Sequence, residues 1–203
     1  MSAAPKKRSA DLTRTHILDI AYQEMYQKGF QGLRVDEVLE KAKLTKGAFY
    51  HHFSSKQELG YSVIDEVLSG FFQVFWIDAL EKSVDPVETI KLSMKNMSDV
   101  LGQNFVTLGC PLNNLCQEMC SLDEGFRSRI TAIYKNWRMC LEEAFERGKK
   151  EGTIGVDIDA KTTSLFITAS IEGCIGMAKS EQDQEMLFSC IGELFVYLDG
   201  LRP

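Results

Sequence analysis

The stretch Leu44–Leu59, LTKGAFYHHFSSKQEL, decides how the rest of the chain is interpreted. Phe49 and Phe53 are four residues apart, so on a helix they share one face and can hold it against its neighbours. Tyr50 follows Phe49 directly and can turn its hydroxyl outward while its ring packs. The stretch predicts a short third helix over Thr45–His52, with one apolar face and one polar face.

A helix–turn–helix is expected around this stretch. Apolar residues in Arg34–Lys41 indicate a short second helix, and the turn AKLT after it is too short for anything but a tight connection. Thr45 can cap the third helix, and Ser54 or Ser55 can cap a fourth that starts at Lys56. Upstream, apolar residues at helical spacing predict a first helix over Asp11–Lys28 that stops at Gly29.

The composition favours an all-α fold. Only 4 prolines occur in 203 residues, 44% of residues are hydrophobic, and alternating valine-rich runs are nearly absent. Later segments read as further helices, the last two over about 159–179 and 183–201. No apolar run of 18 residues occurs and the basic N-terminus lacks an apolar signal segment, so we expect a cytoplasmic protein with no membrane contact. The 6 cysteines are then expected to be thiols rather than a disulfide framework.

Charge is unevenly distributed along the chain. The net charge is −6, but residues 1–60 carry 10 Lys+Arg against 7 Asp+Glu, and the remainder carries 13 against 22. A basic head on an acidic body indicates a module that contacts nucleic acid, joined to a domain with another task.

The adjacent His51 and His52 do not predict a metal or catalytic site. Neighbouring residues on a helix point about 100° apart, whereas zinc pairs on helices are three or four residues apart. The remaining histidine is His16, and no cysteine lies in the first 100 residues. The stretch also lacks a nucleophile and an orienting acid. We expect no metal and no cofactor.

A DNA-contacting helix explains the stretch better. Such a helix enters the major groove with its N-terminal turn and one polar face. Thr45, Lys46, Tyr50 and His51 supply that face, and Gly47 lets the backbone approach the sugar-phosphate chain.

The run LRVDEVLEKAKLTKGAFYHHFSSKQEL closely resembles the helix–turn–helix of the TetR family of bacterial transcriptional regulators, over roughly residues 11–60. This resemblance implies an all-α homodimer of about nine helices that binds palindromic double-stranded operator DNA. Most such proteins repress until a small-molecule inducer binds the C-terminal domain. The resemblance also implies a division of the chain into a flexible basic arm (1–10), a helix–turn–helix DNA-binding domain (11–57) and a ligand-binding and dimerisation domain (58–203).

The resemblance also implies individual DNA contacts. The third helix would contact DNA through Thr45, Lys46, Gly47, Tyr50 and His51. His52 and Lys56 would reach phosphate groups, and Arg34 and Val35, at the start of the second helix, would touch the backbone. Two positions depart from the family pattern. Lys43 replaces a usual glycine in the turn, which predicts strain, and Leu33-Arg34 replaces a usual serine or threonine cap.

If this interpretation holds, the rest of the chain must form the dimer and respond to a signal. The last two helices, one rich in small residues and one apolar nearly all round, are expected to form the dimer interface, with a buried core helix as the alternative. Aromatic residues and one cysteine are candidates for an apolar ligand pocket, with ordinary core packing as the alternative: Phe71, Phe75, Trp76, Phe105, Cys110, Trp137.

Three cysteines suggest a second mode of response. Cys110 lies just before a helix, where the dipole would lower its thiol pKa, and Cys116 and Cys120 share one helical face. The segment also looks like the corresponding region of a TetR-type repressor that responds to electrophiles and oxidants. A redox or electrophile sensor acting through Cys110 is therefore the alternative function. The three cysteines could otherwise be small buried hydrophobic residues or bind a soft metal. Cys140, Cys174 and Cys190 read as core.

Other classes of protein fit less well. A thiol-dependent enzyme would need a base, and no histidine follows His52. A helical adaptor that binds only protein has no need for the polar face of Thr45–Lys56. We expect a DNA-binding regulator, not an enzyme.

Overall fold

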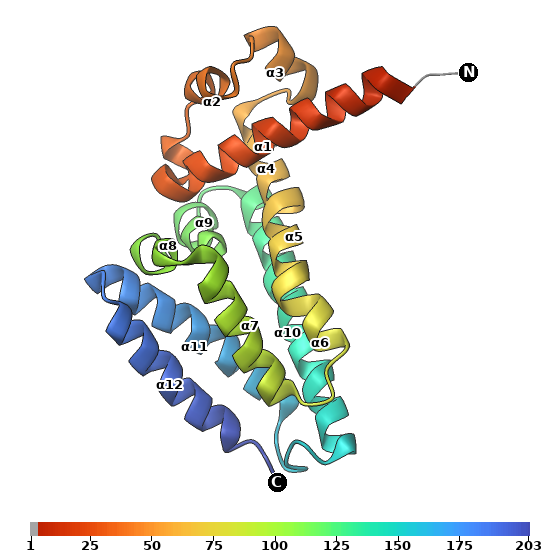
Figure 1. Ribbon diagram of the computed structural model, residues 1–203, viewed down its shortest axis with the longest axis vertical. Coiled ribbons are helices and arrows are strands. Elements are labelled where there is room, and N and C mark those ends of the chain that lie inside the picture. The colour runs from red at the N-terminus through yellow and green to blue at the C-terminus, as the bar shows by residue number, and fades with distance from the viewer. Residues whose placement is uncertain (1–3) are drawn as a thin grey trace. The chain divides into compact units, whose positions relative to one another are not determined.

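The computed structural model describes the backbone of residues 4–203, and side chains from Asp11 onward. These residues form helices and no strand, as expected (Figure 1). They fall into two compact units. The N-terminal unit comprises Met1–Gly70 and Asn114–Ile130, and the C-terminal unit comprises Phe71–Asn113 and Thr131–Pro203. Residues 114–130 thus belong to the N-terminal unit although they follow the first segment of the C-terminal unit in the sequence.

The N-terminal unit is built on α1, which runs over Ala4–Gly32. Three short helices follow: α2 (Val35–Ala42), α3 (Lys46–His52) and α4 (Lys56–Ser62), and the helix continues as η1 (Val63–Leu68). The expected flexible arm covers residues 1–10. Residues 1–3 lie outside the described residues, but from Ala4 the backbone already belongs to α1.

Gly29 interrupts α1 where the sequence placed its end. Its backbone is in the left-handed region, at φ 74°, and a Cβ atom there would lie 2.7 Å from a carboxylate oxygen of Glu118. That carboxylate, on α9 (Pro111–Met119), accepts hydrogen bonds from the backbone N–H of Phe30 at 2.9 Å and Gln31 at 2.8 Å. Both the conformation and the close approach therefore require glycine.

The C-terminal unit contains the longer helices. After α5 (Ser69–Phe72) come η2 (Gln73–Ile77), α6 (Asp78–Glu81), α7 (Pro86–Leu101) and α8 (Gln103–Thr107), then most of α10 (Glu124–Glu151), α11 (Ala160–Glu181) and α12 (Gln184–Asp199). The segments from α4 to α6 follow one another without a break. Counting them as one helix, and α8 as an extension of α7, the described residues form the nine expected helices.

Acidic caps start two of the long helices of this unit, α7 and α11. Asp85 accepts from the backbone N–H of Glu88 at 3.2 Å, next to Pro86 at the first position of α7. Asp159 accepts from the N–H of Thr162 at 3.0 Å at the start of α11. Each cap satisfies an N–H group that the helix itself leaves unpaired.

The core of the C-terminal unit is aromatic. Trp76 and Trp137 are buried with ring centroids 4.6 Å apart, and Phe72 packs edge-on against Trp137 at 5.4 Å. Aromatic pairs prefer such tilted geometries. They anchor η2 and α5 against α10.

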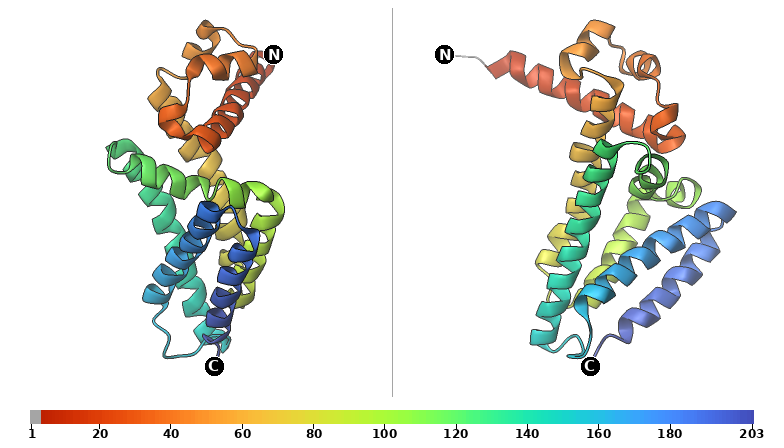
Figure 2. Two further views of the ribbon diagram at one scale, coloured as in Figure 1. Left: turned by 90° about the vertical axis from the view of Figure 1, so that its left-hand side faces the viewer. Right: turned by 180° about the vertical axis from the view of Figure 1, so that it is seen from behind.

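Helices α11 and α12 lie side by side (Figure 2). A disulfide between Cys174 and Cys190 joins them. This corrects the expectation that all the cysteines are free thiols. Cys174 is buried, as expected, whereas Cys190 is half-buried. The sequence could not show the pairing, because it depends on how the two helices pack. Among the described residues, none of the helices is long and apolar enough to cross a membrane.

Candidate nucleic-acid interface and sensor core

The helix–turn–helix is held by local capping. Thr45 is the N-cap of α3 and its hydroxyl accepts from the N–H of Ala48 at 3.3 Å. Ser55 caps α4 by accepting from the N–H of Glu58 at 3.0 Å, and Glu58 accepts from the N–H of Ser54 at 2.6 Å. These contacts form a reciprocal capping pair that confirms the expected start of the fourth helix.

Lys43 occupies the tight turn between α2 and α3. Its backbone is left-handed, at φ 55° and ψ 42°, and its N–H donates to the carbonyl of Glu40 at 3.1 Å. A side chain with Cβ is strained in this region, so the sequence-based prediction of strain at the missing glycine is confirmed.

The two faces of α3 differ as expected. Phe49 and Phe53 are buried, with exposed fractions of 0% and 1%, whereas Tyr50 is 60% exposed. Thr45, Lys46, Gly47 and His51 are also exposed, as is Arg34 before α2, and Val35 is half-buried. A groove of about 560 Å³ lies between the start of α2 and α3, lined by Arg34, Val35, Asp36, Glu37, Lys46 and Tyr50. The structure therefore gathers four of the candidate DNA contacts, Arg34, Val35, Lys46 and Tyr50, around one groove.

Three of the candidates differ from simple phosphate-binding cations. Lys46 forms an ion pair with Asp36 at 3.0 Å, and this hydrogen bond raises the pKa of Lys46. Lys56 donates to the carbonyl of Gln31 at 3.1 Å, and burial lowers its pKa. The pKa of half-buried His52 is lowered by burial and then by His51, so His52 is neutral at pH 7 and can only hydrogen-bond.

The candidate pocket residues lie in several places of the C-terminal unit. Trp76 and Trp137 belong to the buried aromatic core. Phe71 and Phe75 are half-buried, and their rings are tilted against each other with centroids 4.5 Å apart. Phe105 is buried and lines a groove of about 500 Å³ between α7 and α12. Two pairs among these candidates are therefore in direct contact: Trp76 with Trp137, and Phe71 with Phe75.

Cys110 belongs to a polar cluster that the sequence did not reveal. Its Sγ donates to Oε1 of Glu172 on α11 at 3.3 Å, and the hydroxyl of Tyr134 on α10 donates to the same oxygen at 3.3 Å. Among the described residues, the other oxygen, Oε2, is buried and has no hydrogen-bond partner. Burial raises the pKa of Glu172 to about 7.

The expected activation of Cys110 is wrong. Cys110 does lie at the N-terminus of α9, where backbone N–H groups of Leu112 and Asn113 lower its pKa. Burial and the charge of Glu172 outweigh them and raise the thiol pKa well above its ordinary value. The thiol therefore remains protonated at neutral pH. Cys116 and Cys120 lie with their sulfur atoms 3.6 Å apart, as their spacing of four predicted.

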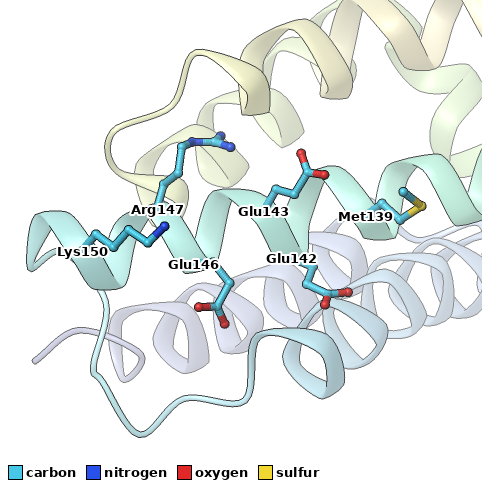
Figure 3. A pocket seen from close by; sticks show the side chains of 6 residues that line it. All are labelled: Met139, Glu142, Glu143, Glu146, Arg147 and Lys150. Carbon is cyan, nitrogen blue, oxygen red and sulfur yellow. The ribbon is translucent and has the colours of Figure 1, made fainter.

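A further hollow of about 480 Å³ lies along α10, lined by Met139, Glu142, Glu143, Glu146, Arg147 and Lys150 (Figure 3). Figure 3 shows Glu143 and Arg147 directed to one side of the helix, and Glu142 and Glu146 to the other. Arg147 donates to the carbonyl of Leu80, so its charge supports the end of α6. This arrangement is a charged helix surface rather than a convergent site.

Comparisons with known proteins agree with the helix–turn–helix. Residues 17–60 match "Bacterial regulatory proteins, tetR family", and residues 86–190, more than half of the chain, match "Tetracyclin repressor-like, C-terminal domain". The transcriptional regulator AcuR of Cereibacter sphaeroides is 26% identical over 180 residues, which cover 89% of this chain and 82% of that protein. The transcriptional repressor DhaR of Mycobacterium sp. is 27% identical over 175 residues, or 86% of each chain.

A solved structure agrees as well. The regulatory protein TetR from Rhodobacter sphaeroides superposes with a TM-score of 0.80 at 25% identity, covering 91% of this chain and 97% of that chain. The superposition therefore extends over both the helix–turn–helix and the helical C-terminal region of this chain. The chain belongs to the TetR family of bacterial transcriptional regulators.

Proposed function

We propose that the protein is a repressor that binds operator DNA as a homodimer and is released by a small molecule bound in the C-terminal unit. The observation that carries this proposal is the surface of α3. Thr45 caps that helix, Phe49 and Phe53 fix its inner face, and Tyr50 stands 60% exposed on the outer face. A surface tyrosine with this exposure, beside a lysine and a histidine, suits hydrogen bonding to a DNA groove.

The dimer interface is proposed on α11 and α12. Large apolar side chains remain exposed on these helices in the single chain: Leu165, Phe166, Met177, Phe188, Val196 and Tyr197. A Cβ atom added at Gly173, Gly176 or Gly192 would meet nothing within 4 Å, so the backbone there is open to close approach. An apolar patch of this kind marks an interaction surface, and two copies would cover it mutually.

DNA binding would use two copies of α3, one per protomer. In a dimer, the recognition helices enter successive major grooves about 34–36 Å apart. Lys46 would exchange Asp36 for a phosphate, and Arg34 would contact the backbone from the start of α2. The protein would then act in the cytoplasm, where the operator lies.

Release is proposed to pass through α9. This helix starts directly after Cys110, in the C-terminal unit, and at its other end Glu118 binds the N–H groups of Phe30 and Gln31 in the N-terminal unit. A ligand that favours another position of α9 would therefore change the support of α1. Binding energy that differs between the two states would shift the population away from the DNA-binding state.

A thiol sensor acting through Cys110 remains the second candidate, supported by the contact between Sγ and Oε1 of Glu172. That carboxylate can accept the thiol proton. The raised pKa of Cys110 argues for a slow reaction, because the thiolate is the nucleophile.

The test is a mobility-shift measurement on the purified protein with the DNA beside its own gene, at two salt concentrations. Tyr50→Ala should weaken binding by roughly tenfold or more. Lys46→Ala should weaken binding and reduce its salt dependence, because one phosphate contact is lost. Lys135→Ala removes an exposed lysine of α10 and serves as the matched control.

Unchanged affinity in both Tyr50→Ala and Lys46→Ala would exclude α3 as the DNA-contacting helix. A repeat with N-ethylmaleimide addresses the second candidate. Loss of DNA binding in the wild type, but not in Cys110→Ser, would favour the thiol sensor over a reversibly bound inducer.

A further inference from the structure

In the cluster of Cys110, Tyr134 and Glu172, the two oxygens of the Glu172 carboxyl group differ in their hydrogen bonds. Oε1 of Glu172 receives two hydrogen bonds, both from neutral donors, at 3.3 Å each. Oε2 is buried and receives none from the described residues. Buried carboxylates in proteins are ordinarily paired with a cation or with several donors, because an isolated charge is costly away from water.

No cation compensates this carboxylate within the described part of the chain. The pKa of Glu172 is affected by burial and by hydrogen bonds from Cys110 and Tyr134, and no lysine, arginine or histidine contributes. This distinguishes it from Glu24, the buried carboxylate of the N-terminal unit, which binds Lys28 at 2.7 Å and also binds Lys41. A cation that reached Glu172 would therefore gain a charge-assisted hydrogen bond without displacing an existing partner.

The surroundings of the carboxyl suit an apolar body attached to such a cation. Tyr134 and Trp137 are three residues apart on α10, so they lie on the same face of that helix. Trp137 packs at a tilt against Trp76, and the indole N–H groups of both are buried without hydrogen-bond partners in the described structure. Tyr134 and Glu172 are half-buried, although Oε2 itself is buried, so a ligand must displace neighbouring side chains to reach it.

We propose that Glu172 is the recognition point for the inducer, and that the inducer is a small protonated amine on an apolar or aromatic body. Its N–H group would donate to Oε2 of Glu172, while Cys110 and Tyr134 continue to donate to Oε1. The aromatic faces nearby would hold the apolar part and favour the positive charge. This inference rests on the proposed function, because it specifies the ligand class of the same regulator.

A neutral hydrogen-bond acceptor is the competing ligand class, and pH separates the two. A protonated Glu172 can donate to a carbonyl group, whereas an ionised Glu172 attracts an ammonium group. Cys110 and Tyr134 are the titratable groups that contact it, and Cys110 stays protonated near neutral pH. Affinity for an amine should therefore rise between pH 6 and pH 8, and affinity for an acceptor should fall.

The experiment measures ligand binding by the full chain without DNA, using isothermal titration calorimetry. The probes are benzylammonium, 2-phenylethylammonium and cyclohexylammonium, each against the alcohol of the same skeleton. At least one amine should bind about tenfold or more tightly than its alcohol. Binding should also release protons, because it ionises a carboxyl group with a pKa near neutrality, and the measured heat should therefore vary with the buffer.

Glu172→Gln should abolish both the preference for the amine and the proton release. The matched control is Glu181→Gln, which removes an exposed carboxylate from the same helix and should leave both unchanged. Circular dichroism confirms that each variant is folded. Equal binding of amine and alcohol, full amine preference in Glu172→Gln, or no amine binding up to about 1 mM would overturn the proposal.

A separate mobility-shift assay keeps this inference distinct from the regulator itself. If the protein binds its upstream DNA but shows no amine preference, only the ligand class is wrong. If it binds no DNA, the regulator proposal fails whatever the calorimetry shows.

Discussion

Replacing Glu172 by glutamine should stabilise the protein at alkaline pH and have little effect in acid. The pKa of Glu172 is raised from the ordinary 4.5 to about 7 by burial. Each pH unit of such a displacement corresponds to about 1.4 kcal/mol, so ionising Glu172 costs the folded state about 3 kcal/mol. Glutamine keeps the hydrogen-bond acceptor for Cys110 and Tyr134 but carries no charge.

The sign follows from proton binding. Between pH 4.5 and 7 the folded protein holds the proton of Glu172 while the unfolded chain has lost it. The free energy of unfolding therefore falls as pH rises through this window and levels off above it. Because Glu172→Gln removes this titration, its stability relative to the wild type should rise by about 3 kcal/mol between pH 4.5 and pH 8.

Urea unfolding of both proteins at several pH values, at one protein concentration, measures the effect. Comparing the two proteins cancels the titration of every other group, provided that both unfold cooperatively. Glu181→Gln, on the exposed part of α11, should follow the wild type at all pH values. A stability difference for Glu172→Gln that does not change with pH would refute the argument that the carboxyl is buried without a compensating charge.

Two further changes test the N-terminal unit. Lys43→Gly should raise the free energy of unfolding, measured with urea, by about 0.5–1 kcal/mol. Glycine tolerates φ 55°, and its greater freedom in the unfolded chain offsets only part of this gain. Lys43→Ala keeps the strained backbone and should show no such gain. Glu24→Gln should cost about 2 kcal/mol near neutral pH, since Lys28 and then Lys41 lower the pKa of the buried Glu24. That cost should fade below about pH 4.5 as the wild-type carboxylate is protonated, and an undiminished cost in acid would exclude the ion pairs as its source.

The helix–turn–helix could be predicted because its determinants are local. Phe49 and Phe53 share a face through helical periodicity alone, and Thr45 and Ser55 cap helices that begin one residue later. The strain at Lys43 was expected from the family pattern, which usually has glycine at this turn position, and Lys43 does have a positive φ. Each of these contacts joins residues at most four positions apart, so the sequence contains all the information they require.

Contacts between distant segments were not predictable in the same way. Glu118 binds backbone groups near Gly29 across 88 positions of sequence, and the disulfide joins Cys174 to Cys190 on separate helices. The polarity of Glu118 or the spacing of the two cysteines does not indicate these partners. The sequence suggested a reactive Cys110, and backbone N–H groups at the start of the helix do lower its pKa. Burial and Glu172 raise that pKa by more, and both come from tertiary packing.

Glu172 shows where sequence reasoning could have gone further. It is the one charged residue between positions 162 and 178, in the segment TTSLFITASIEGCIGMA. Thr168, Ile171 and Ile175 are buried on the same helix, and a residue four after Thr168 must lie at the edge of that buried face. A lone carboxyl at such an edge signals a specific partner, since an unpaired buried charge is costly. The sequence alone could not show that its partners within the chain are neutral, and it is this neutrality that leaves a cationic ligand to complete the site.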